Sequence, residues 1–211
     1  MNIREEIEKR KLIAVLTLHD ADTAADVARA LWDGGVTAVE LTLRTPGALA
    51  CLRRVKSACP EMLLGAGTVL TPEQVAQARD AGADFGVSPG TNRRVLEAAH
   101  KAGMFFAPGI MTPTDIESAL EAGCTLLKYF PAATAGGLEH LRAMSTPYLH
   151  LGVKFIPLGG VNPENLRMMV SDKLIAAVGG SWLATAEQVE NRKFGEIRAQ
   201  AEAAKKILSD I

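Results

Sequence analysis

This chain of 211 residues has few aromatic residues and no large excess of charge of either sign. Phe, Trp and Tyr make up only 5% of it, whereas 48% is hydrophobic, so the core must be mainly aliphatic. The 23 basic and 24 acidic residues nearly cancel, which leaves no basic surplus for neutralising nucleic-acid phosphates. No apolar stretch approaches the about 20 residues that span a bilayer. We therefore expect neither a nucleic-acid partner nor a membrane partner.

Signals for metal binding, disulfides and secretion are also missing. The cysteines Cys51, Cys59 and Cys124 include no C-x-x-C pair, and the four histidines form no H-x-H or H-x-x-x-H pair. We therefore expect no disulfide framework, no local metal site and no cofactor. The first ten residues are rich in charge, which is unlike a secretory signal. These features favour a cytoplasmic protein with free thiols.

Short apolar runs recur along the chain and predict eight β-strands. Ala-rich amphipathic stretches lie between them and have the length of crossover helices, for example at 21–32, 48–58, 72–80 and 92–101. The expected strands are 13–18, 36–43, 62–66, 85–88, 104–107, 125–130, 153–158 and 174–178.

Glycine and proline mark the boundaries of these units in the same way from end to end. Several expected helices end in Gly just before a strand. Helix starts pair a capping residue with Pro at Thr45-Pro46, Thr71-Pro72, Thr112-Pro113 and Asn162-Pro163. The pattern predicts a single domain over 1–211 and an α/β fold, the (β/α)8 TIM barrel, with a doubly wound open sheet as the alternative. Ile3 and Ile7 predict a short N-terminal helix that plugs the bottom of the barrel.

The expected strand 36–43 places polar groups on one face. Glu40, Thr42 and Arg44 alternate with aliphatic residues, so all three should point into the barrel. Burying a carboxylate and a guanidinium is costly, and such groups concentrate at functional sites. A structural Glu–Arg pair is the alternative interpretation.

Lys128 interrupts the apolar strand 125–130 near its carboxyl end, where barrel enzymes carry catalytic groups. It shares a face with Leu126 and Phe130, and apolar surroundings favour the neutral, nucleophilic form of an amine. Lys154, at the start of its strand, is interpreted as structural. The alternative for Lys128 is an ion pair with a carboxylate such as Glu40, and a Glu and a Lys in one pocket are also the groups that Schiff-base chemistry requires.

Glycines end four of the expected strands. Gly159 and Gly160 follow one strand, and Gly179, Gly180 and Ser181 follow the next. Loops after the seventh and eighth strands of barrels often bind phosphate through backbone N–H groups, so these turns predict an anion site.

Two further strand ends, Gly65-Ala66-Gly67-Thr68 and Ser88-Pro89-Gly90, would let a substrate approach the backbone, and Thr68 offers a hydroxyl donor. Turn glycines followed by a cap are the alternative interpretation.

Seven motifs in this order resemble those of the class I 2-keto-3-deoxy-6-phosphogluconate (KDPG) / 4-hydroxy-2-oxoglutarate (KHG) aldolases, over about residues 12–182. The motifs are Glu40-Leu-Thr-Leu-Arg44-Thr45, Gly65-Ala-Gly-Thr68-Val, Val87-Ser-Pro89-Gly90, Pro108-Gly-Ile-Met-Thr-Pro113, Lys128-Tyr-Phe-Pro131-Ala, Pro157-Leu-Gly-Gly-Val and Gly179-Gly-Ser-Trp182.

The resemblance implies a homotrimeric barrel that makes or breaks a carbon–carbon bond with pyruvate as the nucleophilic partner, acting on a small 2-keto acid. It implies that Lys128 forms the Schiff base and that Glu40 shuttles protons. The implied binding residues are Arg44 and Thr68 for the pyruvyl carboxylate, Pro89 and Phe130 for the pocket wall, and Gly160, Gly180 and Ser181 for phosphate.

Three segments depart from the family pattern. Residues 131–137 lack an expected Glu and Asn, Leu158 stands where Thr is common, and 13–15 lacks a frequent proline. None of these departures affects Lys128, Glu40 or Arg44. They therefore leave the expected reaction class unchanged and leave only the substrate preference open.

Two other functions remain as alternatives. A sugar-phosphate isomerase barrel would share the glycine turns but does not require a lysine inside strand 125–130. A catalytically silent barrel that serves binding or assembly would not require three internal charges, although fold alone does not determine function.

Overall fold

Parallel strands alternate with helices throughout the computed structural model, which describes residues 2–209. The strands are β1 (Leu12–Leu16), β2 (Ala38–Thr42), β3 (Leu63–Gly67), β4 (Phe85–Val87), β5 (Phe105–Ala107), β6 (Gly109–Ile110), β7 (Leu126–Tyr129), β8 (Lys154–Pro157) and β9 (Val178–Gly180). They are short, from two residues in β6 to five in β1.

The strands form a curled six-stranded parallel sheet, in the order β5-β4-β3-β2-β1-β9, and a three-stranded sheet, in the order β6-β7-β8. Two isolated parallel bridges, Phe155 with Ile175 and Leu158 with Gly179, join β8 to the segment that ends in β9. The α/β class and the parallel sheet predicted from the sequence are thereby confirmed.

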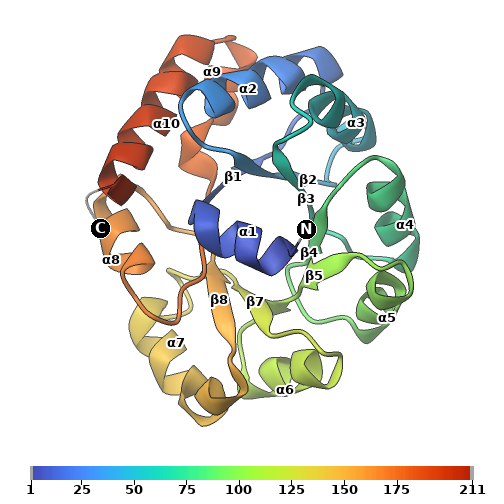
Figure 1. Cartoon of the computed structure of the whole chain (residues 1–211), viewed down its shortest axis with the longest axis vertical. Coiled ribbons are helices and arrows are strands. Elements are labelled where there is room, and N and C mark those ends of the chain that lie inside the picture. The colour runs from blue at the N-terminus through green and yellow to red at the C-terminus, as the bar shows by residue number, and fades with distance from the viewer. Residues whose placement is uncertain (1, 210–211) are drawn as a thin grey trace.

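Helices surround the strands, as Figure 1 shows, and α1 lies across the centre of that view. The helices are α1 (Ile3–Arg10), α2 (Ala21–Asp33), α3 (Ala48–Ala58), α4 (Pro72–Asp80), α5 (Arg93–Lys101), α6 (Pro113–Glu121), α7 (Gly137–Ser145), η1 (Thr146–Leu151), α8 (Pro163–Val170), η2 (Ser181–Leu183), α9 (Ala186–Glu190) and α10 (Phe194–Ser209).

Two hydrophobic clusters follow from the alternation of side chains along the strands. The larger cluster lies between sheet and helices and includes Val39 and Leu41. The smaller one fills the space inside the sheet and includes Ile7 of α1, Ala38 and Leu126. Because Ile7 is completely buried there, the predicted N-terminal helix does cover the end of the sheet at which the strands begin.

The strand predicted at 174–178 is wrong in position. The backbone turns at Asp172, whose carbonyl accepts from the Ile175 amide, and the ladder with β1 begins only where Val178 pairs with Leu12. The short strand β6 was not predicted. It arises because Pro108 has no N–H to donate, so the chain leaves β4 at Ala107 and pairs with β7 from Gly109 onward.

Three of the four predicted helix starts are confirmed, since Thr71, Thr112 and Asn162 each accept a backbone N–H at the N-cap before Pro. The start at Thr45 is wrong. The Thr45 hydroxyl donates instead to the Leu18 carbonyl at 2.6 Å, and α3 begins after Gly47. Thr45 therefore ties the β2–α3 connection to the end of β1.

Candidate active site

A lysine and a carboxylate meet inside the sheet. Lys128 Nζ donates to Glu40 Oε1 at 3.1 Å, and the two residues are only 5% and 2% exposed. The pair joins segments 88 residues apart in the chain. It is the alternative that the sequence left open for Lys128, and it brings together the two groups predicted to carry the chemistry.

The two strands hold these side chains by the alternation of their backbones. Glu40 lies in the middle of β2, where it is paired with Val15 of β1 and Gly65 of β3. Lys128 lies in β7 between Gly109 and Ile156. Glu40 and Lys128 therefore face each other from different sheets, and each is fixed by strands on both sides.

Gly67, at the end of β3, makes room for the Glu40 carboxylate. A Cβ at this position would overlap Glu40 Oε1 and come within 2.7 Å of its Cγ. The backbone angle is not the reason for glycine here, because Gly67 has no positive φ. Its missing side chain lets the carboxylate lie against the strand.

Arg44 lies at the rim of the site rather than inside it, because it is exposed and follows the end of β2. This corrects the expectation of a buried guanidinium. Arg44 Nη2 donates to Thr17 Oγ1 at 2.7 Å and Nε donates to Thr42 Oγ1 at 3.3 Å. The two hydroxyls are 2.9 Å apart, so they orient the guanidinium as one unit.

Thr17 was missed by the sequence analysis, although a signal was available. It continues the alternation of Ile13 and Val15 one step past the end of β1, so it reaches the same rim as Arg44.

The remaining predicted pocket residues lie at the ends of their strands. The Phe130 ring is 36% exposed, and its centroid is 5.4 Å from Lys128 Nζ. Pro89 is exposed after β4. Thr68 is half-buried after β3, and its φ of +58° is unusual for a β-branched residue. Such backbone strain is concentrated at functional sites.

The Gly159–Gly160 turn lies beside Gly179, because Leu158 bridges to that residue. The turn expected at Gly179 and Gly180 is wrong, since both residues belong to β9 and pair with Ile13 and Ala14 of β1. Gly159 and Gly160 both have φ of +87°, a conformation that favours glycine. Gly179 and Gly180 are buried, whereas Ser181 is exposed at the start of η2.

Leu158 is 5% exposed and belongs to the cluster inside the sheet. A Cβ at Gly179 would overlap its side chain, so the Leu158 side chain is packed against Gly179 of β9.

Other groups offer less to a reaction. Burial raises the pKa of the thiols of Cys51 and Cys59 and raises that of Cys124 to about 11, which opposes formation of a nucleophilic thiolate. Among residues 2–209, no group of three or more His, Cys, Asp or Glu side chains is placed to hold a metal ion. None of the helices described is long and apolar enough to cross a membrane.

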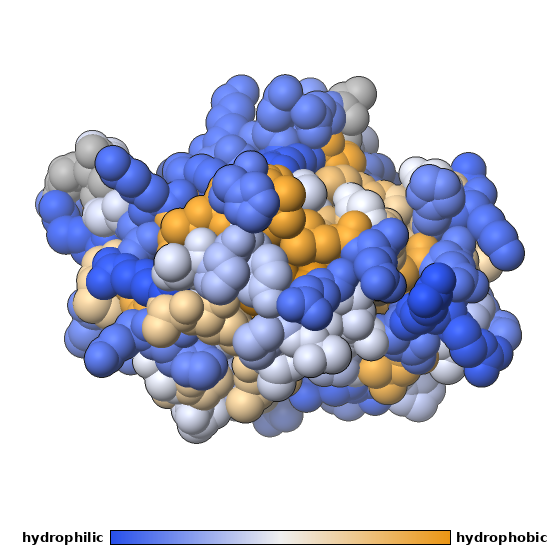
Figure 2. All heavy atoms as spheres, turned by 90° about the horizontal axis from the view of Figure 1, so that it is seen from below, coloured by the Kyte–Doolittle hydropathy of each residue, from blue (hydrophilic) through white to orange (hydrophobic). Residues whose placement is uncertain are grey.

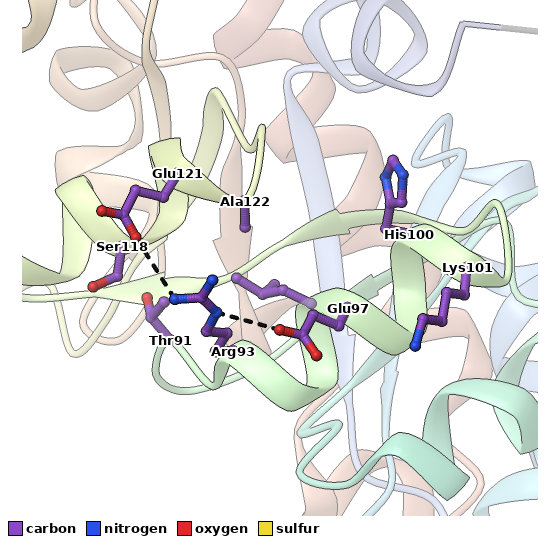
Figure 3. A pocket seen from close by; sticks show the side chains of 9 residues that line it. Thr91, Arg93, Glu97, His100, Lys101, Ser118, Glu121 and Ala122 are labelled. Atoms are coloured by element: carbon purple, nitrogen blue, oxygen red, sulfur yellow. Dashed lines mark hydrogen bonds and ion pairs between the residues drawn. The ribbon is translucent and has the colours of Figure 1, made fainter.

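A pocket of about 400 Å³ lies outside the sheet, against α5 and α6 (Figure 3). Arg93 spans it with ion pairs to Glu97 at 3.2 Å and Glu121 at 3.9 Å. These groups are largely exposed, and exposed ion pairs are weak. None of the predicted site residues lines this pocket, so the chemistry is better placed at Lys128.

A buried lysine, a carboxylate in contact with it and a guanidinium at the rim of a parallel α/β sheet define a class of enzyme that attacks carbonyl compounds with an amine. In such an arrangement an amine can serve as the nucleophile and a carboxylate can accept its proton. A guanidinium can pair with a substrate carboxylate.

The chain belongs to the KDPG and KHG aldolase family, whose model matches residues 3–200. It is 40% identical over 199 residues to the 2-dehydro-3-deoxy-phosphogluconate aldolase of Treponema pallidum, covering 94% of each chain. It is 36% identical to the KHG/KDPG aldolase of Escherichia coli K12, covering 92% of this chain and 90% of that one. The KDPG aldolase of Legionella pneumophila, solved with pyruvate as a covalent carbinolamine, superposes with a TM-score of 0.91 at 34% identity, covering 97% and 98% of the two chains.

We predict that Gly67→Ala disables the enzyme without unfolding it. The added methyl group would displace the Glu40 carboxylate, and a misplaced catalytic group typically costs about 100-fold in rate. Turnover in an aldolase assay measures the loss, with circular dichroism as the check on folding. Gly195→Ala is the matched control, because a Cβ there meets nothing within 4 Å. A folded Gly67→Ala enzyme with normal turnover would contradict the role given to this contact.

Proposed function

We propose that this chain cleaves KDPG to pyruvate and glyceraldehyde 3-phosphate, and KHG to pyruvate and glyoxylate, through a Schiff base on Lys128. The observation that carries the proposal is the buried contact of Lys128 with Glu40. A sugar-phosphate isomerase does not require a lysine inside β7, and a silent binding module does not require the buried pair.

The first half of the reaction makes the substrate carbonyl an electron sink. Lys128 passes a proton to Glu40, and its neutral Nζ adds to the C2 ketone to give a carbinolamine. Loss of water leaves a protonated imine between Nζ and C2. The positive nitrogen can then accept an electron pair from the carbon chain.

The second half of the reaction breaks the C3–C4 bond and then protonates C3. Glu40, acting through a water, removes the proton of the C4 hydroxyl. The C4–O bond then becomes the carbonyl of the leaving aldehyde. The electron pair of the broken C3–C4 bond moves into the imine and forms an enamine. Glu40 returns a proton to C3, which gives the pyruvyl imine. Water adds to C2, pyruvate leaves and the free lysine is restored.

The substrate is held at both ends. Arg44, oriented by Thr17 and Thr42, binds the pyruvyl carboxylate together with Thr68. Pro89 and Phe130 form the wall beside the imine. The Gly159–Gly160 turn and the Gly179–Gly180 end of β9, with the hydroxyl of Ser181, bind the distal phosphate through backbone N–H groups.

The site belongs to a single-domain closed (β/α)8 barrel over 1–211. Only Pro108 separates β5, which pairs with β4, from β6, which pairs with β7. The bridges from β8 to the β9 segment and the pairing of β9 with β1 support closure on the other side. The three thiols, free in residues 2–209, support a cytoplasmic location.

Borohydride reduction in the presence of pyruvate tests the reaction. The wild-type chain should gain one reduced pyruvyl group on intact-mass analysis, because borohydride traps the imine on Nζ. Lys128→Ala should lose both this adduct and turnover. Lys154→Ala, whose side chain is half-buried at the start of β8, is the matched control and should keep both. Modification of another lysine in Lys128→Ala would contradict the assignment, and no adduct in the wild type would reject the Schiff-base mechanism.

The part of the site that binds the distal end of the substrate should favour a phosphate group there. We predict a higher kcat/KM for KDPG than for KHG, because backbone donors of the Gly159–Gly160 turn and of the adjacent end of β9, together with the Ser181 hydroxyl, suit a dianion. Leu158 removes no backbone donor, so it should not reverse this order. Inorganic sulfate should compete weakly with KDPG. If KHG were cleaved as well as KDPG and sulfate did not inhibit, these donors would not select phosphate, and Leu158→Thr would test whether that residue is the cause.

A homotrimer is the proposed assembly. Figure 2 shows hydrophobic side chains exposed among hydrophilic ones on the face seen there from below. Exposed hydrophobic residues include Leu149 and Leu151 of η1 and Met111 before α6. A small domain gains stability by covering such groups between subunits. Light scattering at micromolar concentration should give three times the chain mass of 22.4 kDa, and the mass of one chain would contradict the proposal.

A further inference from the structure

Tyr129 follows the candidate Schiff-base lysine but faces the opposite side of β7. It is 1% exposed and belongs to the cluster between sheet and helices. Its ring stacks on His140 of α7, with centroids 6.5 Å apart. Its hydroxyl donates to the Ala135 carbonyl at 3.0 Å. The mechanism gives this buried hydroxyl no part in the chemistry.

The acceptor lies in residues 131–137, the post-lysine loop. This loop reads Pro-Ala-Ala-Thr-Ala-Gly-Gly, so it has no charged or bulky side chain to hold its position. Its first part is bound by backbone groups, because the amides of Ala132 and Ala133 donate to the carbonyls of Leu158 and Gly159 at 2.7 and 2.9 Å. The loop therefore lies directly against the Gly159–Gly160 turn.

The fit between loop and turn is tight. A Cβ at Gly160 would overlap the Ala133 methyl group, and one at Gly159 would lie 3.3 Å from Pro131 Cα. A small shift of the loop would therefore change the position or the freedom of Gly159 and Gly160. The bond from Tyr129 holds the far end of the loop, where Gly136 and Gly137 both have positive φ.

We propose that Tyr129 is a positioning residue that holds the post-lysine loop against the Gly159–Gly160 turn and thereby shapes the phosphate-binding end of the site. This inference rests on the proposed function for the meaning of that end. Tyr129 acts through the loop and does not touch the reacting atoms. Burial raises the pKa of its hydroxyl, so the group remains a donor throughout the neutral pH range.

Tyr129→Phe isolates the hydroxyl, since it keeps the buried ring. Losing one hydrogen bond to the loop should raise KM for KDPG about threefold to tenfold, the range expected for a neutral hydrogen bond. The kcat for KDPG and both parameters for KHG should stay within about twofold, because Lys128 and Glu40 are not moved. Tyr148→Phe is the matched control, because Tyr148 lies in η1, after α7, and its hydroxyl donates to Glu117 of α6 at 2.8 Å rather than to the loop.

Hydrogen exchange supplies a readout independent of activity. Peptides covering the post-lysine loop should exchange faster in Tyr129→Phe than in the wild type, while peptides from β2 and β3 stay unchanged. In the wild type, inorganic phosphate should slow exchange in this loop and in the Gly159–Gly160 turn. This wild-type measurement tests the coupling of loop and turn, on which the inference depends, even if the variant folds poorly.

Three results would overturn the inference. An equal loss for KDPG and KHG, or a lower melting temperature with no change in KM, would describe a merely structural tyrosine. Loop exchange in the wild type that phosphate does not affect would separate the loop from the phosphate-binding end. Failure of the proposed function is distinguishable, because it would show as an absent pyruvyl adduct in the wild type, which Tyr129 does not influence.

Discussion

The buried contact of Lys128 with Glu40 is the constraint on which the rest of the site depends. Removing an ammonium and a carboxylate from water costs several kcal/mol per ion, and one 3.1 Å contact repays only part of it. An all-hydrophobic interior would be at least as stable. The proposed mechanism gives the pair a reason in chemistry, since the carboxylate that contacts the lysine is there also the base that receives its proton.

This pair dictates the backbone around it. Glu40 reaches Lys128 only because β3 ends in Gly67, whose missing side chain admits the carboxylate. The lysine lies beside Pro108, whose carbonyl accepts the Lys128 amide at 2.8 Å while the chain changes partner from β4 to β7. The hydrophobic cluster inside the sheet fills the remaining space from the α1 side, which leaves the reactive groups at the opposite, strand-end side.

Side-chain alternation made much of this site predictable. It placed Glu40 and Lys128 inside the sheet, and it placed Val39 and Leu41 against the helices. It failed where the backbone stops being regular. Arg44 lies beyond the last residue of β2, so its side chain reaches the rim instead of the interior. The turn at Asp172 and the use of Thr45 as a cross-link depend on tertiary contacts that periodicity does not contain.

Two of the three departures from the family pattern, at Leu158 and at residues 131–137, concern the distal end of the proposed site, and they share one physical consequence. Leu158 is packed beneath Gly179, and the loop after Lys128 offers only Ala, Thr and Gly beyond its proline. Neither segment presents a charged side chain to the distal group of a substrate. In the proposed function, recognition there depends mainly on backbone N–H groups, whose strength depends on geometry rather than on residue type. If so, whatever holds the Gly159–Gly160 turn in place, including the Tyr129 hydroxyl on the outer face of β7, contributes to substrate preference without touching the substrate.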